Sequence, residues 1–211
     1  MQEFNRDYWE KMYEMPLEEL PWEIKEAPQE LKAYIDANRI EGGSALDAGC
    51  GTGNFSVYLA KNGYTVTGVD YSEKALAIAR KNNEELKLPL TYIRADLTEL
   101  EKAVSGMTYD LILDYKVSHH LSAERLKEYV GQCVRILKPR GRILLVCYSD
   151  KDIDAAGKGS AIGKFGNEMY YRPAEEIREF YNGLREVECH EVMLGKHLNH
   201  AGYCFVFEKN V

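Results

Sequence analysis

The chain has 211 residues, of which 45% are hydrophobic and 29% charged, and its formal net charge is −7. This composition is ordinary for a globular protein, and the acidic balance argues against nucleic acid as the main partner, because phosphate binding usually needs a basic surface. The N-terminus is polar, and no apolar run reaches the about 18 residues of a membrane-spanning helix. We therefore expect a cytoplasmic protein that binds neither nucleic acid nor a membrane.

The N-terminal 40 residues are aromatic and acidic, and three prolines divide them into short helical pieces, of which residues 28–38 form an amphipathic helix. Strand and helix patterns alternate after the Gly42-Gly43 pair. One helix is predicted to begin at Asn54, and two more are predicted to be capped by Ser72 and by Ser122. The strands are predicted at residues 44–48, 65–70, 91–94, 109–115 and 142–148. The helix after Ser122 is expected to end at Pro139-Arg140-Gly141. Such alternation implies right-handed crossovers and a doubly wound parallel sheet.

The C-terminal part departs from this pattern. Residues 149–169 form a long polar connection, and loops of that length are usually lids or disordered. A helix follows at 173–181, and strands are predicted at 185–192 and 202–208. The connection between these two strands is too short for a crossover helix, so we expect them to pair in antiparallel fashion.

Residues 45–54 read Ala-Leu-Asp-Ala-Gly-Cys-Gly-Thr-Gly-Asn, so that Gly49, Gly51 and Gly53 form a G-x-G-x-G motif after a short strand. Glycine lacks the Cβ that would keep a backbone loop away from a bound cofactor. The fingerprint for a dinucleotide pyrophosphate is the longer G-x-G-x-x-G. The shorter spacing therefore favours S-adenosylmethionine over a redox cofactor.

Acidic residues lie at the carboxyl ends of the first four predicted strands, namely Asp47, Asp70 and Asp114 within the last two residues of theirs and Asp96 just after its own. Ligands of open α/β sheets bind beyond the carboxyl ends of the strands. An acid about twenty residues after the first glycine is placed to bind the ribose hydroxyls, which points to Asp70. The side chain of Asp96 is placed to accept from the adenine amine. Each acid has an alternative role as a turn former or as the N-cap of the next helix.

Together these segments resemble the class I S-adenosylmethionine-dependent methyltransferases over residues 44–148, in particular methyltransferase type 11 and the thiopurine- and tellurite-type enzymes. The resemblance implies an α/β, Rossmann-like, doubly wound seven-stranded sheet that is mostly parallel with an antiparallel last strand. It implies S-adenosylmethionine as cofactor and S-adenosylhomocysteine as product. It places the glycine loop beside the methionine part, Tyr71 against adenine, and Leu97 at the adenine edge. The full predicted cofactor site comprises Asp47, Gly49, Cys50, Gly51, Gly53, Asn54, Asp70, Tyr71, Asp96, Leu97, Tyr115, Trp9, Tyr13 and Trp22.

The aromatic residues before the first strand, which include Trp9, Tyr13 and Trp22, are similar to the N-terminal cover of the thiopurine- and tellurite-type enzymes. Aromatic faces suit a sulfonium because they attract cations and exclude water. The alternative is a helix that packs on the sheet edge and uses these rings as ordinary core. We expect a single domain over 1–211, with a cover at 1–40, a cofactor-binding core at 44–148, a flexible substrate-side connection at 149–172 and a C-terminal helix with antiparallel strands at 173–211.

His119 and His120 follow the fourth strand, and either could act as general base for a substrate proton. The alternative is a turn into the next helix. Tyr115 and Lys116 are expected in the acceptor pocket. The run from Tyr170 to Arg172 either lines the same pocket or forms a surface turn.

Metal binding is not expected. The five cysteines are scattered, without a Cys-x-x-Cys pair, and are predicted to be reduced and mostly buried. His197 and His200 have an i, i+3 spacing, but the sequence shows no third ligand beside them, so a loop at the substrate mouth is favoured.

We therefore predict a methyltransferase that transfers a methyl group by direct displacement to a small-molecule acceptor. The Pro-Pro-aromatic motif of nucleic-acid amino methylation and the paired glutamates of protein arginine methylation are absent. The alternatives are a non-catalytic regulator that binds S-adenosylmethionine or S-adenosylhomocysteine, and a nicotinamide-dependent oxidoreductase. The acceptor atom and the oligomeric state stay open.

Overall fold

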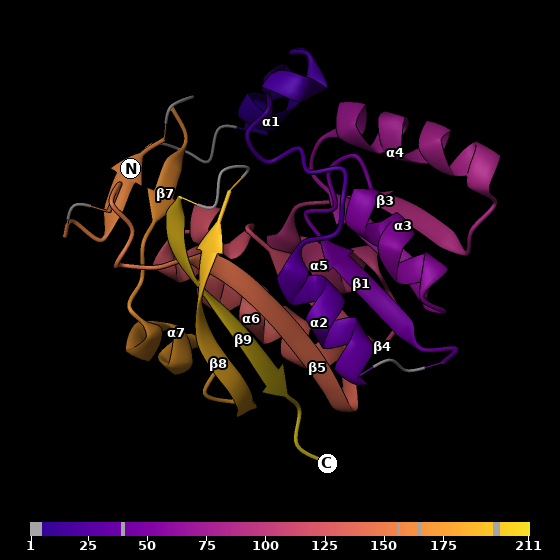
Figure 1. Cartoon of the computed structure of the whole chain (residues 1–211). Helices are drawn as coiled ribbons and strands as arrows, with labels where there is room; N and C mark the ends of the chain where they lie inside the picture. The colour runs from indigo at the N-terminus through magenta and orange to yellow at the C-terminus, as the bar shows by residue number, and fades with distance from the viewer. Residues whose placement is uncertain (1–5, 39–40, 156, 164–165, 196–198) are drawn as a thin grey trace. The chain divides into compact units, whose positions relative to one another are not determined.

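The computed structural model describes residues 6–38, 41–155, 157–163, 166–195 and 199–211 (Figure 1). The chain divides into two compact units, the first ending at Leu97 and the second beginning at Thr98. Among the described residues, no helix is both long and apolar enough to cross a membrane.

The first unit contains three parallel strands in the order β3-β2-β1. The strands are β1 (Ser44–Ala48), β2 (Thr65–Asp70) and β3 (Leu90–Arg94), and the α-helices are α1 (Arg6–Met12), α2 (Gln29–Asn38), α3 (Asn54–Lys61) and α4 (Glu73–Leu86). Helix α3 contacts β1 and β2, and α4 contacts β2 and β3. Leu59 of α3 and Leu76 of α4 are fully buried. Ser72 caps α4 as predicted, since its hydroxyl accepts from the backbone N–H of Ala75.

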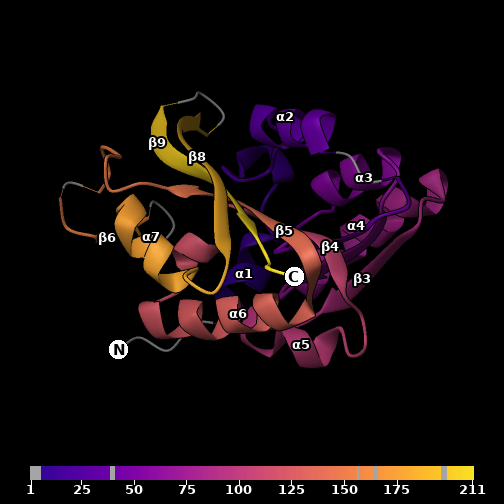
Figure 2. The ribbon, with the colours of Figure 1, turned by 90° about the horizontal axis from the view of Figure 1, so that it is seen from below.

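The second unit contains four strands in the order β4-β5-β9-β8. The strands are β4 (Tyr109–Tyr115), β5 (Leu137–Tyr148), β8 (Arg185–Leu194) and β9 (His200–Glu208), and the α-helices are α5 (Leu100–Ala103), α6 (Ala123–Ile136) and α7 (Ala174–Phe180). Helix α6 packs on β5 and contacts α7 (Figure 2). Strand β9 is antiparallel to both β5 and β8, which confirms the predicted antiparallel pairing at the C-terminus.

The predicted boundary between α6 and β5 is wrong. The helix ends at Ile136, and β5 begins at Leu137, so the Pro139-Arg140-Gly141 segment lies inside the strand. The pairing register with β4 shifts between Tyr109 and Leu111, and Arg140 has a φ of 61°. The register shift marks a β-bulge in β5, and a bulge tolerates a proline such as Pro139 inside a strand. The backbone N–H of Arg140 still donates to the carbonyl of Lys209, so long-range pairing outweighs the local stop signal.

The connection at 149–169 carries more structure than its composition indicated. Strands β6 (Ser160–Ile162) and β7 (Glu168–Tyr170) form a small antiparallel sheet of their own. Ser149 also forms an isolated parallel bridge with Arg172. The start and the end of the connection are therefore held together, and its predicted flexibility stays a prediction.

Candidate cofactor and acceptor sites

The glycine loop joins β1 to α3 in the first unit. Gly49, Gly51 and Gly53 have φ angles of 69°, 54° and 81°, which is the left-handed region that favours glycine. The backbone N–H groups of Gly49 and Cys50 both donate to the carbonyl of Val69, at 2.7 and 3.0 Å. A Cβ at Gly51 would lie 2.8 Å from the hydroxyl of Tyr13. The loop therefore needs glycine at Gly51 both for its backbone angle and for the space above it.

Asp70 lies at the carboxyl end of β2 and is fixed by two backbone donors. Its Oδ2 accepts from the N–H of Gly51 and its Oδ1 from the N–H of Ser72, both at 2.8 Å. Burial raises the pKa of this carboxyl above its usual value, and the backbone N–H groups offset only part of that rise. A carboxylate keeps further lone pairs for hydroxyl donors after two such bonds. Its position and chemistry fit a pair of ribose hydroxyls.

Asp47 and Cys50 are both engaged within the unit. Asp47 is buried, and its Oδ2 accepts from the hydroxyl of Ser56 at 2.6 Å, which links β1 to α3. Burial raises the pKa of Asp47 to about 7. Burial also raises the pKa of the Cys50 thiol, whose Sγ would lie 2.8 Å from a Cβ at Gly68. Both side chains thus pack within the first unit, and their contacts with the cofactor stay a prediction.

The predicted aromatic cluster packs together next to the loop. Trp22 makes edge-to-face contacts with Trp9 and Tyr13, with ring centroids 5.3 and 6.4 Å apart, and its Nε1 donates to the Tyr13 hydroxyl at 3.2 Å. The Tyr13 hydroxyl also approaches Gly51. The rings thus pack against one another and also lie next to the glycine loop. This arrangement is compatible both with ordinary core packing and with a cover over the cofactor.

Glu10 and Glu23 are two residues that sequence reasoning missed. Glu10 on α1 accepts from the hydroxyl of Ser72 and from the N–H groups of Glu73 and Lys74, at the N-terminus of α4. A carboxylate is favourable there because the helix dipole is positive at that end. In the sequence, Glu10 and Glu23 appear only as carboxylates among aromatic residues, and that pattern does not predict which residues they contact.

The carboxylate of Glu23 contacts the glycine loop directly. It accepts from the Thr52 hydroxyl at 2.9 Å and from Asn54 Nδ2 at 2.8 Å. The predicted cofactor residue Asn54 also donates to the carbonyl of Ile24. The amide of Asn54 therefore ties residues 23–24 to the loop, and a cofactor contact by Asn54 stays a prediction.

The predicted adenine side follows the ends of β2 and β3. The N–H of Ala95 donates to the carbonyl of Asp70 at 3.0 Å, which joins the two strand ends. The guanidinium of Arg94 lies 5.6 Å from the ring centroid of Tyr71. Asp96 is half-buried, and Leu97 is buried. The structure thus brings Asp70, Tyr71 and Asp96 to one edge of the first unit's strands.

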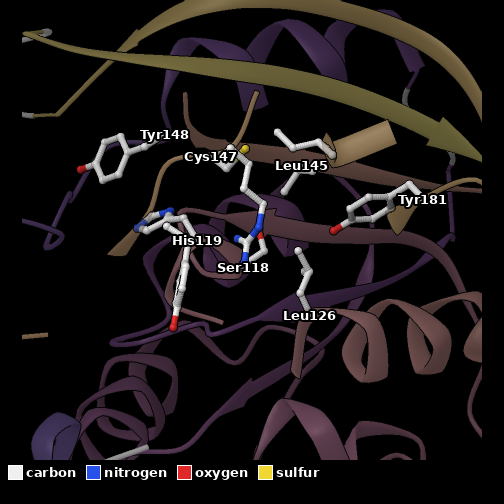
Figure 3. Close-up of a pocket in the computed structure, with 10 residues that line it drawn as sticks. Ser118, His119, Leu126, Leu145, Cys147, Tyr148 and Tyr181 are labelled. Atoms are coloured by element: carbon white, nitrogen blue, oxygen red, sulfur yellow. The ribbon is translucent and has the colours of Figure 1, made fainter. Parts of the chain in front are cut away.

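In the second unit, a pocket lies next to the turn η3 (Ser118–His120), which follows β4 (Figure 3). It has room for about one water-sized group. Its lining residues come from η3, α6, β5, β7, α7 and the segments beside them, and they are Ser118, His119, Leu126, Leu145, Cys147, Tyr148, Tyr170, Arg172, Ile177 and Tyr181. Tyr170 and Arg172 were predicted here, whereas Tyr171 stacks on Tyr148 with centroids 5.9 Å apart.

His119 is buried, and its Nδ1 has no hydrogen-bond partner in the part of the chain that the structure describes. Its ring lies 4.2 Å from that of His120 and 4.5 Å from that of Tyr148. Burial holds the pKa of His119 well below its usual range, and the charges of His120, Lys116 and Arg172 lower it further. His119 is therefore neutral at pH 7.

His120 differs from its neighbour because its Nδ1 is engaged. This nitrogen lies 3.3 Å from the carbonyl oxygen of Glu168 and 3.3 Å from Nδ2 of Asn167. Burial lowers the pKa of His120 to about 4. Tyr115 ends β4 in this unit, whereas the other predicted cofactor residues lie in the first unit.

His200 lies beside two carboxylates, which corrects the expectation that no acid accompanies it. Its Nδ1 is 3.2 Å from Oδ2 of Asp152 and 3.7 Å from Oδ2 of Asp154. Asp152 already accepts from the N–H groups of Ala201 and Asp154, so these residues close a turn. His197 lies outside the described residues.

Comparison with known proteins identifies the family. A family profile described as a methyltransferase domain matches residues 45–141. A protein of Geobacillus sp. (strain WCH70) that is named as a methyltransferase is 32% identical over 151 residues, or 70% of this chain and 58% of its own length. The ubiquinone biosynthesis O-methyltransferase of Rhizobium leguminosarum bv. trifolii (strain WSM2304) is 32% identical over 136 residues, or 64% and 50%. The chain thus spans about half the length of the curated relatives it matches.

The fold is also that of a solved structure from a study of the conversion of a disulfide bond into a thioacetal group during echinomycin biosynthesis. The two chains superimpose with a TM-score of 0.80 and 25% identity, over 97% of this chain and 93% of the other. This confirms the predicted Rossmann-like α/β fold with its antiparallel strand. The cofactor of such proteins is S-adenosylmethionine, and the chain belongs to the class I S-adenosylmethionine-dependent methyltransferases.

Proposed function

We propose that the protein transfers a methyl group from S-adenosylmethionine to a small-molecule acceptor. The observation that carries this proposal is the Asp70 carboxylate, which the N–H groups of Gly51 and Ser72 hold at the end of β2 beside a left-handed glycine loop. The bound cofactor supplies a methyl group on a sulfonium, which a nucleophile attacks directly. The protein's task is then mainly to align the reactants and to exclude water.

The first unit supplies the residues that we assign to the cofactor. Gly49 and Gly51 lie beside its methionine part, Asp70 binds the ribose hydroxyls, and Tyr71, Asp96 and Leu97 surround adenine. Tyr13 and the two tryptophans form the cover above the loop. The hydrogen bond between Trp22 and Tyr13 and the closeness of Tyr13 to Gly51 support this last assignment.

The second unit supplies the residues that we assign to the acceptor. His119 is the stronger candidate for a general base, because it is neutral and no described residue bonds to its Nδ1, whereas Nδ1 of His120 already has close neighbours. Proton transfer by a positioned side chain typically contributes about 10²- to 10⁴-fold in rate.

Binding and turnover test the proposal in sequence. S-adenosylhomocysteine at about a hundred times its Kd should raise the free energy of unfolding by about 2.7 kcal/mol, whereas NAD should not change it. The purified chain is then incubated with S-adenosylmethionine and a panel of phenols, thiols and amines, and formation of S-adenosylhomocysteine is measured. Absence of S-adenosylhomocysteine binding would contradict the proposal. Binding without turnover on the panel would instead favour the regulator.

The variant His119→Asn separates catalysis from binding. It should reduce turnover on an accepted compound by about 10²-fold or more, while the affinity for S-adenosylhomocysteine stays within about twofold. Equal turnover in the variant and the wild type would remove His119 from the mechanism.

A further inference from the structure

The charged side chain that lines the pocket of the second unit is cationic. The lining residues include Arg172 and the buried His119 but no aspartate or glutamate. Lys116 adds a second cation nearby, since its Nζ lies 5.5 Å from the ring centroid of Tyr148, which also lines the pocket. A pocket that gathers cations without a lining carboxylate favours an anion and disfavours another cation.

Arg172 keeps hydrogen-bonding capacity for a ligand. It is buried, its Nη2 donates to the carbonyl of Leu121 at 2.7 Å, and its Nε donates to Oε1 of Glu176 at 3.1 Å. A guanidinium has five N–H donors, and no described residue accepts from its Nη1. Its ring contacts are with Tyr170 and Phe180, at 4.8 and 5.5 Å, and an aromatic face does not neutralise the charge.

The carboxylates of Glu176 and Asp114 each have a hydrogen-bond partner, although Oδ2 of Asp114 is buried without one among the described residues. Glu176 is half-exposed and pairs with Nε of Arg172. Oδ1 of Asp114 accepts from the N–H groups of Val117 and Ser118, in the turn that carries His119. Neither carboxylate lines the pocket.

The neutral protonation state of His119 also favours a ligand with an acidic group. The cations that face it are Lys116 from the turn after β4 and Arg172 from the segment before α7, and the neutral imidazole of His120 lies beside it. These cations favour the neutral imidazole of His119 and weaken it as a base. Its Nδ1, which has no partner among the described residues, can accept a hydrogen bond from an acidic O–H or S–H group. An unpartnered buried nitrogen is costly unless a ligand or water satisfies it.

We infer that this pocket binds the O–H or S–H group of an acidic acceptor, such as a phenol or a thiol, and that Arg172 stabilises the anion that forms when His119 takes the proton. This inference rests on the proposed methyl transfer. An amine acceptor would enter as an ammonium ion and be repelled by the same cations. Arg172 is thus the residue that selects the class of acceptor atom.

The step balances as follows. The acceptor's proton goes to His119 and from there to solvent. A bond forms between the acceptor oxygen or sulfur and the methyl carbon, and the bond from that carbon to the sulfonium sulfur breaks with its electron pair on sulfur. The products are the methylated acceptor, S-adenosylhomocysteine and one proton, so no oxidant or reductant is needed.

A coloured phenol tests the inference without turnover. We would titrate 4-nitrophenol, whose phenolate absorbs visible light and whose phenol does not, into the full chain saturated with S-adenosylhomocysteine, at a pH below the pKa of the free phenol. The wild type should bind the phenolate and increase the apparent acid dissociation constant by about tenfold, which is one pKa unit. 4-nitroaniline, which is similar in shape and has no acidic O–H, should bind at least about tenfold more weakly.

Three variants test whether the spectral shift of 4-nitrophenol depends on the charge of Arg172. Arg172→Gln should abolish the spectral shift, Arg172→Lys should retain at least half of it, and Glu176→Gln, which removes only the partner of Arg172, should retain or increase it. If Arg172→Gln does not fold, the lysine variant and Glu176→Gln still decide between a charge effect and a packing effect.

The inference is overturned if the wild type binds neither probe, if it binds 4-nitroaniline as tightly as 4-nitrophenol, or if Arg172→Gln leaves the shift unchanged. Any of these results together with intact binding of S-adenosylhomocysteine would leave the proposed methyl transfer standing. Loss of S-adenosylhomocysteine binding in the wild type would instead remove the proposed function itself.

Discussion

The carboxylates around the glycine loop of the first unit differ from the groups around the pocket of the second unit in how their hydrogen bonds are satisfied. In the first unit, the carboxylates of Asp47, Asp70 and Glu23 each accept hydrogen bonds from the glycine loop or from the helix that follows it. In the second unit, Nδ1 of His119 and the hydroxyl of Tyr181 are buried beside the pocket without a partner among the described residues. An unsatisfied buried group costs about 1–3 kcal/mol. The difference supports our proposal that the first unit holds a preorganised cofactor site and that a ligand satisfies the polar groups around the pocket of the second unit.

The largest expected effect comes from breaking the preorganised side at Asp70. Asp70→Ala removes the acceptor of the Gly51 and Ser72 N–H groups and the proposed ribose contact. Hydrogen bonds to charged groups contribute about 1.5–3 kcal/mol each, so the affinity for S-adenosylhomocysteine should fall about 100-fold or more, as measured by isothermal titration calorimetry. The exposed carboxylate of Asp36 provides the control variant Asp36→Ala, which should keep wild-type affinity. Unchanged binding by Asp70→Ala would show that the ribose contact is misassigned.

The histidines of the acceptor side predict loss of stability in acid. The pKa of His120 is lowered to about 4, so between pH 6.5 and 4 the unfolded state binds a proton that the folded state does not. The free energy of unfolding should therefore decrease as the pH falls, by about 2 kcal/mol at pH 5 for this residue alone. Urea unfolding at pH 7.5 and 5 should show a smaller decrease for His120→Asn.

The exposed residue His190 on β8 is the matched control for that measurement. The variant His190→Asn should follow the wild-type pH dependence. If His120→Asn follows it as well, the burial of His120 does not control acid stability.

Gly51 and Gly42 have similar backbone angles, so their alanine variants distinguish a steric clash in the glycine loop from backbone strain. A Cβ at Gly51 would meet the Tyr13 hydroxyl at 2.8 Å, whereas a Cβ at Gly42, whose φ is 71°, would meet nothing within 4 Å. Gly51→Ala should therefore weaken binding of S-adenosylhomocysteine by about tenfold. Gly42→Ala should cost only backbone strain, about 1 kcal/mol of unfolding free energy, at wild-type affinity. Equal affinities of the two variants would argue against a close fit over Gly51.

The smallest expected effect concerns the attachment of α1. Glu10→Ala removes three hydrogen bonds at the N-terminus of α4 and should lower the free energy of unfolding by about 1 kcal/mol. Glu14→Ala removes only the exposed ion pair with Lys74 and should cost less than about 0.5 kcal/mol. Urea unfolding of both variants compares them, and equal losses would show that Glu10 does not anchor the helix.

Local signals made much of the fold predictable. The bounds of β2 and β4 and the caps at Ser72 and Ser122 were predicted correctly, because alternation of apolar residues and capping chemistry depend on neighbours in sequence. The start of β5 was not, because its first residues are held by pairing with β4 and with the end of β9. The contacts of Glu10 with α4 and of Glu23 with the glycine loop join residues about 30 to 60 positions apart, and no local pattern encodes them.

The sequence by itself determined the fold class and the cofactor, because the alternate glycines and the acids at the strand ends are local features with few chemical interpretations. Only the tertiary structure distinguishes the two histidines. Glu168 and Asn167, far away in the sequence, contact Nδ1 of His120, whereas Nδ1 of His119 has no partner among the described residues. It also decided the character of the acceptor pocket. A buried cation acts over several ångströms in space, and Arg172 reaches His119 only when the chain after β7 folds back onto the turn after β4.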